Sequence, residues 1–312
     1  KLKPWDRLMI VAGEKNMAEA EVLKRQAEKR THAVSILLVE RQGQHVGVFF
    51  DQHPDIFDSY NAVLAATEYS LVTTKAARNV IKRRAKFLSL PLSTNNGQSM
   101  LTFDFLKMDV KKSKLTAEVI MKYLKSSSRI QIKTDAGTDL TLMKRGRMPG
   151  FFNGVTADGG GFSSASIEVY IPVEECGTNG TMVIDGSLGY IGAAREDTRV
   201  VFKEGRIVEI EETPTGKRLK EYMEGYHDSG IYVAGELGIG LNSYSQCAGR
   251  CYIEDESAYG TFHIGLGRNI ALGGTHEANG HFDLVAREPN LFADNRQLIQ
   301  QGRIIIPEPV FF

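Results

Sequence analysis

The sequence predicts an α/β N-terminal domain with a parallel sheet, followed by a β-rich (α+β) C-terminal domain that binds metal. Two observations divide the 312 residues into unlike halves. Residues 1–130 contain 22 Lys and Arg against 13 Asp and Glu, whereas the remainder contains 16 against 25. Residues 1–130 also contain only 4 of the 31 glycines. A composition change of this size favours separate domains, which we place at 1–128 and 129–312.

Strand-like and helix-like stretches alternate in the first half. The continuous apolar run over 34–39 has the length and composition of a buried parallel strand. In residues 17–30 the apolar side chains recur at helical spacing. This alternation predicts a parallel sheet with crossover helices. The expected elements are strands over 8–11, 34–39 and 70–73 and helices over 17–30, 54–66 and 76–85.

The composition excludes several classes of function. No apolar run approaches the roughly 18 residues of a membrane-spanning helix, so we expect a soluble protein with no membrane partner. No glycine-rich phosphate loop follows a predicted strand. The basic cluster over 82–86 lacks interleaved aromatic residues, which argues against nucleic acid as a partner. Because a signal peptide is not evident and three cysteines are too few for a disulfide scaffold, we expect a cytoplasmic protein.

The second half has the alternating pattern of strands. A tight turn is indicated at Glu204-Gly205, between two strand-like runs, and a helix over 217–224. Residues 149–161 contain five glycines and are predicted to form a mobile loop. The expected strands are 129–134, 140–143, 181–184, 198–203, 206–211 and 303–306.

Candidate metal ligands are concentrated between Glu168 and Asp283. His281 and Asp283 are two residues apart on an expected strand, so their side chains point to the same face. An imidazole with a carboxylate suits Zn, Mn, Co or Fe(II). Glu236 and His263 lie in apolar, glycine-rich runs, where a charged side chain is costly unless it is paired or bound to metal. Two histidines and three carboxylates on separate strands predict a site for one or two divalent ions.

Several motifs resemble those of the aminopeptidase T-like metallo-aminopeptidase family. They are Gly235-Glu236, His263-Ile-Gly-Leu-Gly267, His281-x-Asp283, Thr134 to Leu140 and Ser166-Ile-Glu168-Val. The resemblance implies two domains, two divalent ions such as Zn, Co or Mn in the β-rich domain, and a possible homodimer. It also implies that the metal ligands are Glu168, Glu236, His263, His281 and Asp283.

Other motifs resemble the 2,5-dihydroxypyridine dioxygenase family. These are Tyr259-Gly-x-Phe262, Gly267-x-Asn269 and Gly273-Gly274 before His281-x-Asp283. This resemblance implies one Fe(II) held by two histidines and one aspartate. Glu236 would then stand in place of a histidine ligand, and this carboxylate favours hydrolysis over oxygenation.

The function predicted from the sequence is that of a metal-dependent hydrolase that cleaves a peptide or amide bond in a small molecule or short peptide. Glu236 and Asp283 are the candidate carboxylates that bridge two ions, and Glu168 is either a metal ligand or the general base. Glu168 and Glu236 are therefore the candidate catalytic residues. The alternatives are an Fe(II) ring-cleaving dioxygenase and a non-catalytic binding protein. The tyrosine that the aminopeptidases carry would fall at Ile270, with Tyr244 or Tyr259 as possible substitutes.

The remaining polar residues receive simpler interpretations. The acidic run Glu254-Asp255-Glu256 is expected to be a solvated loop, with attraction of a substrate ammonium as the alternative. His276-Glu277 and His227-Asp228 are expected in turns. Cys247 and Cys251 are expected to be core residues. The histidines interpreted as surface residues are His32, His45 and His53.

Overall fold

The computed structural model describes residues 2–40, 47–156 and 161–306. The chain forms two compact units, Lys1–Phe103 with Phe152–Ala165 and Asp104–Phe151 with Ser166–Phe312. These units differ from the predicted division at 128/129. The helix α4 (Val110–Ser126) belongs to the second unit because its buried side chains join the hydrophobic core of that unit. Residues 152–165 return to the first unit because they contain a strand of its sheet.

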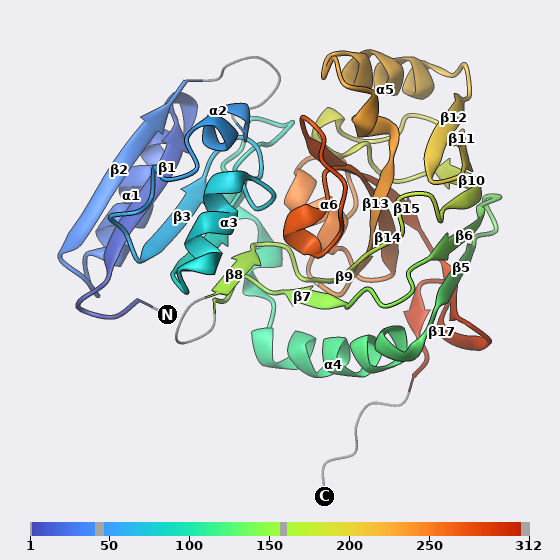
Figure 1. Ribbon diagram of the computed structural model, residues 1–312, viewed down its shortest axis with the longest axis horizontal. Coiled ribbons are helices and arrows are strands. Elements are labelled where there is room, and N and C mark those ends of the chain that lie inside the picture. The colour runs from blue at the N-terminus through green and yellow to red at the C-terminus, as the bar shows by residue number, and fades with distance from the viewer. Residues whose placement is uncertain (1, 41–46, 157–160, 307–312) are drawn as a thin grey trace, which may run out of the picture. The chain divides into compact units, whose positions relative to one another are not determined.

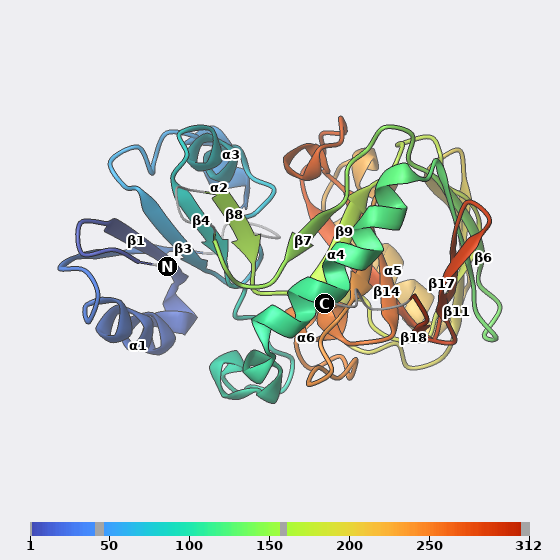
Figure 2. The ribbon, with the colours of Figure 1, turned by 90° about the horizontal axis from the view of Figure 1, so that it is seen from below.

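The first unit is a parallel α/β layer, as the sequence predicts. Its five-stranded sheet has the order β2-β1-β3-β4-β8, and its strand pairs are parallel. The helix α1 lies on one face of this sheet, and α2 and α3 lie on the other (Figure 2). The elements are β1 (Arg7–Gly13), α1 (Met17–Ala27), β2 (Ala33–Val39), α2 (Gly47–Gln52), β3 (Ala62–Ala66), α3 (Lys75–Lys82), β4 (Lys86–Ser89) and β8 (Gly161–Ser164).

Two predicted elements in this unit are wrong. The helix expected over 54–66 is a series of turns followed by β3, and the strand expected over 70–73 is a turn. The run Ala62–Ala66 is apolar on every side, so its pattern does not distinguish a buried strand from a buried helix. It becomes the strand between β1 and β4, and four of its five residues are fully enclosed.

The second unit contains two antiparallel sheets. The larger has the order β12-β11-β10-β6-β5-β16-β17-β18, and the smaller has the order β15-β14-β13-β9-β7. The predicted strands of this half are all present, with ends shifted by a few residues. The strands are β5 (Arg129–Lys133), β6 (Asp139–Met143), β7 (Gly150–Phe152), β9 (Glu168–Pro172), β10 (Asn179–Ile184), β11 (Thr198–Lys203), β12 (Arg206–Ile210), β13 (Ala234–Gly240), β14 (Thr261–Gly267), β15 (His281–Arg287), β16 (Asn290–Ala293), β17 (Arg296–Gln300) and β18 (Arg303–Ile304).

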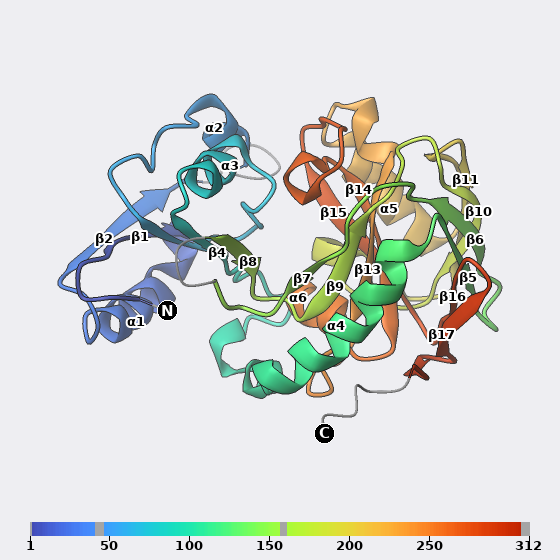
Figure 3. The ribbon, with the colours of Figure 1, turned by 60° about the horizontal axis from the view of Figure 1, so that its bottom comes forward.

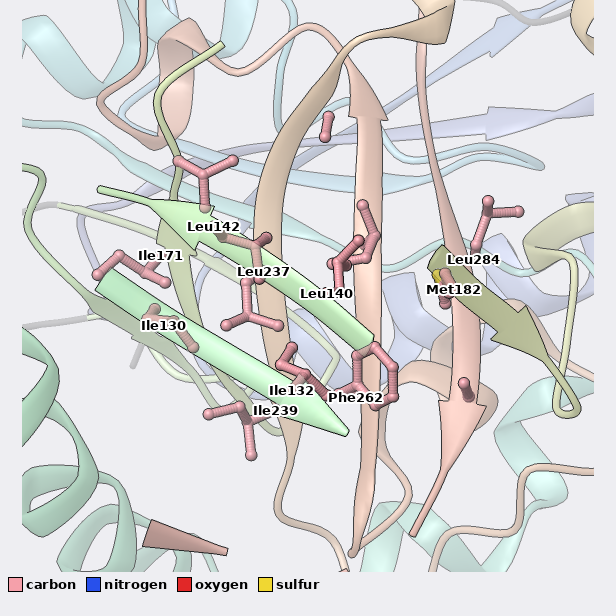
Figure 4. Packing of buried hydrophobic residues seen from close by; sticks show 14 of the residues in the cluster. Ile130, Ile132, Leu140, Leu142, Ile171, Met182, Leu237, Ile239, Phe262 and Leu284 are labelled. Atoms are coloured by element: carbon pink, nitrogen blue, oxygen red, sulfur yellow. The ribbon is translucent and has the colours of Figure 1, made fainter. Parts of the chain in front are cut away.

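The core of the second unit lies between these two sheets. Leu237 and Ile239 of β13 and Phe262 of β14 point toward Ile132 and Leu140 of the larger sheet (Figure 4). All of these side chains are almost completely removed from water. Burying a side chain of this size stabilises the fold by roughly 1.5–3 kcal/mol. The core therefore fixes which face of the smaller sheet points inward.

The helices of the second unit contact both sheets: α4 and α6 (Tyr252–Ser257) contact the smaller sheet, whereas α5 (Pro214–Glu224) contacts β11 of the larger sheet (Figures 1 and 3). The helix α4 lies along β9, and α5 begins with the side chain of Thr213 accepting a hydrogen bond from the backbone of Gly216. The short helix α6 lies against β13, β14 and β15.

The loop predicted over 149–161 contains β7, and residues 157–160 fall outside the described part of the chain. No helix in the described part is both long and apolar enough to cross a membrane.

Candidate metal centre

The candidate ligands lie on the face of the smaller sheet that is turned away from the core. Side chains alternate along a strand, so the residues between the core positions of β13, β14 and β15 share this second face. The strand register sets Asp283 of β15 opposite Gly265 of β14, and Gly265 opposite Glu236 of β13. The two carboxylates thus flank a glycine on the central strand. His281 reaches the same place from two residues before Asp283, as the sequence predicts.

Glu236, His281 and Asp283 form a compact set of metal donors. One ligand atom from each lies within 4.8 Å of the other two. The Nε2 atom of His281 is 3.2 Å from Oε2 of Glu236 and 3.4 Å from Oδ1 of Asp283. The other ring nitrogen, Nδ1, lies 2.9 Å from the backbone oxygen of Arg268, which orients the ring so that Nε2 faces the carboxylates. An outer hydrogen bond of this kind is typical of metal-binding histidines.

The space among these donors depends on Gly265. A Cβ atom at this position would lie 2.8 Å from Oδ1 of Asp283, 2.8 Å from Cε1 of His281 and 2.9 Å from Cβ of Glu236. Oδ1 of Asp283 is buried and accepts no hydrogen bond from any described residue. A buried carboxylate oxygen without a donor is costly unless something else balances its charge. Two carboxylates and one imidazole are the donors that a borderline or hard divalent ion prefers, so these residues fit such an ion.

Glu168 and His263 form a second pair on the same face. Nε2 of His263 is 3.0 Å from Oε2 of Glu168, and both residues are buried. The imidazole extends over Gly238 of β13, where a Cβ atom would lie 1.9 Å from Nε2. The glycines that flank these strands in the sequence therefore permit the close approach that their pattern predicts. Nδ1 of His263 is buried and has no hydrogen-bond partner among the described residues.

The surroundings on this face raise the pKa values of Glu236 and of both imidazoles. Burial raises the pKa of Glu236, and the charges of Asp283 and Glu168 raise it further. Burial alone would lower the pKa of both imidazoles, but the surrounding carboxylates outweigh it. Glu168 and Asp283 raise the pKa of His263 to about 9, and Asp283 and Glu236 raise that of His281 well above 6.5. Protons on the imidazoles thus balance the carboxylates, and a bound divalent ion would replace them in this role.

Two residues of α6 belong to the site: Tyr252, which the sequence analysis did not select, and Glu256, which it placed in a solvated loop. The hydroxyl of Tyr252 donates a short hydrogen bond to Oδ2 of Asp283. Glu256 lies one helical turn further on and is buried, and burial together with the charges of Glu168 and Asp283 raises its pKa well above 4.5. The signal that was available is the spacing of four between a tyrosine and a glutamate, which places both on one face of a helix.

The prediction that residues 254–256 form a solvated acidic loop is wrong. All three side chains are buried in α6. Glu254 forms an ion pair with Arg250 at 2.5 Å, and Asp255 accepts hydrogen bonds of 2.9 Å from the backbone of Ala248 and Gly249. Because these two acids already have partners inside the fold and are shielded from water, they do not form an exposed rim for a substrate ammonium.

The other singled-out residues lie outside the centre. Tyr244 and Tyr259 are about half exposed, and Ile270 begins a short 3-10 helix after β14. His276 contacts the backbone oxygen of Gly230, and Asp228 caps a 3-10 turn, which confirms both as loop residues. The structure places the rest as follows: Cys251 buried and Cys247 partly buried, both as free thiols; His32 and His53 exposed; and His45 outside the described residues.

The chain thus combines a parallel α/β unit with a two-sheet β unit that carries a candidate metal site. The family model described as 2,5-dihydroxypyridine 5,6-dioxygenase matches residues 96–306. This is more than half of the chain, so the protein belongs to that family. The sequence analysis favoured hydrolysis, and the family match favours its alternative, the dioxygenase.

Relatives and solved structures resemble this chain in sequence and in fold. The 2,5-dihydroxypyridine 5,6-dioxygenase of Pseudomonas putida is 24% identical over 64% of this chain, and the match spans 60% of the length of that relative. The solved structure of 2,5-dihydroxypyridine dioxygenase from Pseudomonas putida has a TM-score of 0.77 at 15% identity, covering 98% of this chain and 94% of that one. Wild-type AmpT from Thermus thermophilus has a TM-score of 0.65 at 14% identity, covering 98% and 95%. Both family resemblances that the sequence suggests are thus found again. The resemblance to the aminopeptidase is one of fold alone.

Proposed function

We propose that this chain is an Fe(II)-dependent dioxygenase that opens the ring of a hydroxylated pyridine or a similar small aromatic compound. The observation that carries the proposal is the convergence of Glu236, His281 and Asp283, whose ligand atoms lie within 4.8 Å of one another. Membership of the dioxygenase family supplies the reaction class. In that reaction both atoms of O2 enter the substrate as one ring bond breaks, so no further reductant is needed.

The donor set differs by one residue from the usual iron triad. Non-haem Fe(II) oxygenases use two histidines and one carboxylate and keep coordination positions open. Here one histidine and two carboxylates would hold the ion, again with three protein ligands. An Fe(II) ion in such a site supplies the binding and activation of O2.

The Glu168–His263 pair is suited to proton transfer beside the ion. Oε2 of Glu168 lies 3.0 Å from Nε2 of His263 and fixes the orientation of the imidazole ring. A buried, oriented imidazolium can donate a proton to a substrate oxygen and recover it later. On this proposal His263 and Glu168 act as an acid–base pair, whereas Glu236, His281 and Asp283 bind the metal.

A second candidate function is hydrolysis at a two-metal site. It is favoured by the specific observation that three carboxylates and two histidines share one face, with Glu168 and His263 next to the other three donors. A second ion at this pair would activate a water molecule for attack on a peptide or amide bond. The two candidates therefore differ in the role of Glu168 and His263 and in the number of ions for each chain.

The test uses protein purified without oxygen and loaded with Fe(II). Oxygen consumption is measured with 2,5-dihydroxypyridine as the probe, and Asp283→Asn is the matched control because amide replaces carboxylate without a change of size. The proposal predicts oxygen uptake that parallels substrate loss in the wild-type protein and not in the variant. Absence of uptake, together with hydrolysis of an aminoacyl anilide by Zn- or Co-loaded protein, would reverse the choice.

A further inference from the structure

The contacts of Tyr252 indicate a role that goes beyond packing. This tyrosine is 5% exposed, and its hydroxyl donates a hydrogen bond to Oδ2 of Asp283. Oδ1 of the same carboxylate accepts no hydrogen bond from the described residues and faces Nε2 of His281 at 3.4 Å. One oxygen of Asp283 is therefore anchored, and the other is left for a different partner.

The position of Tyr252 is itself fixed from two sides. Its ring stacks on Tyr190 with a centroid distance of 4.1 Å and an interplanar angle of 23°. Its backbone belongs to α6, which lies against β13, β14 and β15. A phenol held in this way cannot follow the carboxylate if the carboxylate rotates. Rotation of Asp283 would break a charge-assisted hydrogen bond, which is about twice as strong as a neutral one.

The register of the strands shows why one orientation matters. Asp283 and Glu236 stand on either side of Gly265, so Asp283 must direct one oxygen across the glycine to share an ion with Glu236. The hydroxyl of Tyr252 occupies Oδ2 and leaves Oδ1 directed toward the other two donors.

From this geometry we propose that Tyr252 is a positioning residue that sets Asp283 as a single-oxygen metal ligand through Oδ1. The inference rests on the proposed metal centre. Without the hydroxyl, Asp283 is free to turn, and its buried Oδ2 loses its donor. Loss of an outer partner of a metal ligand typically weakens metal binding by roughly 10–100-fold.

The experiment compares Co²⁺ binding by the full-length wild-type chain, Tyr252→Phe and Tyr226→Phe. Phe at 252 keeps the ring that stacks on Tyr190 and removes only the hydroxyl. Tyr226 is an equally buried tyrosine whose hydroxyl contacts that of Tyr222 at 3.0 Å, away from the donors. Affinity is measured by titration, and the visible absorption bands of bound Co²⁺ report the arrangement of its ligands. Thermal unfolding in the presence of a chelator checks that each variant is folded.

We expect Tyr252→Phe to bind Co²⁺ roughly 10–100-fold more weakly with shifted bands, and Tyr226→Phe to match the wild type. A 3-fluorotyrosine at position 252 keeps the hydroxyl and should restore both affinity and spectrum, which also decides the matter if Tyr252→Phe does not fold. Equal affinity and identical bands in wild type and Tyr252→Phe would overturn the role of Tyr252 alone. A wild-type chain that binds no Co²⁺ would instead overturn the metal centre, and with it the inference.

Discussion

The two faces of the smaller sheet of the second unit have opposite chemical character. On β13, Leu237 and Ile239 point into the core, while Glu236 and two glycines alternate with them on the other face. The apolar face stabilises the fold by removing hydrocarbon from water. The polar face gathers buried carboxylates and imidazoles at an energetic cost, and that cost is offset only by mutual pairing or by a bound ion. Neighbouring residues of one strand therefore serve different purposes, one stabilising the core and the next contributing to the candidate metal site.

The largest effect is expected for Glu236→Ala, which alters only the polar face. The change removes one of three donors, so the affinity for a divalent ion should fall by more than the roughly 100-fold that loss of an outer partner can cost. Titration with Mn²⁺ or Co²⁺ measures this change, and circular dichroism checks that the fold is kept. A variant with unaltered metal affinity would show that Glu236 is not a ligand.

The adjacent substitution Leu237→Ala should have the reverse pattern. Leu237 is completely buried between the two sheets, and its truncation should reduce the free energy of unfolding by about 2–5 kcal/mol. Chemical denaturation measures the loss of stability. Metal stoichiometry in the folded variant should match the wild type, because the side chain lies on the core face. If instead metal binding is lost at full stability, the two faces are not independent.

Gly265→Ala tests the space between the donors. The new methyl group would stand 2.8 Å from Oδ1 of Asp283, closer than a carbon and an oxygen can approach without movement. We expect metal affinity to fall by roughly 10-fold or more, because a donor shift of this size disturbs the geometry of the site. Gly13→Ala is the matched control, since its nearest neighbour would be Asn16 at 3.7 Å. Unchanged affinity in Gly265→Ala would place the ion elsewhere.

The affinity of the site for a metal ion should also depend on pH. The pKa of His281 is raised well above 6.5, so below that pKa an ion must displace a proton from the imidazole. Affinity should therefore rise with pH by about tenfold for each unit while one proton is released, and should level off once His281 is neutral. The raised pKa of His263, about 9, would extend the rise if a second ion binds there. Calorimetry in buffers of different ionisation enthalpy counts the protons. Affinity that is constant from pH 6 to 9 would contradict this electrostatic account.

The sequence could predict the parts of this site that depend on local periodicity. His281 and Asp283 share a face because side chains on a strand alternate, and the buried glutamate at 236 was identifiable from its apolar surroundings. The opposition of Glu236, Gly265 and Asp283 depends on the register among three strands, which long-range packing decides. The convergence of these residues was predicted from the residue types on separate strands and from the family resemblances, without the register that produces it.

Other parts of the structure could not be predicted because they depend on contacts between residues far apart in the sequence. The run Ala62–Ala66 fits a buried helix and a buried strand equally well, and only pairing with β1 and β4 decides between them. The acidic segment 254–256 has the composition of a solvated loop. Its burial follows from the packing of α6 against β13, β14 and β15, a long-range contact that the local pattern does not show.

Anomalous diffraction from crystals grown with Co²⁺ would locate the metal ion. We expect one anomalous peak at about 2.0–2.2 Å from Nε2 of His281 and from one oxygen each of Glu236 and Asp283. That peak should vanish in Asp283→Asn crystals. A peak at another place, or none next to His281 in well-ordered crystals, would contradict the assignment of these three residues as the metal site.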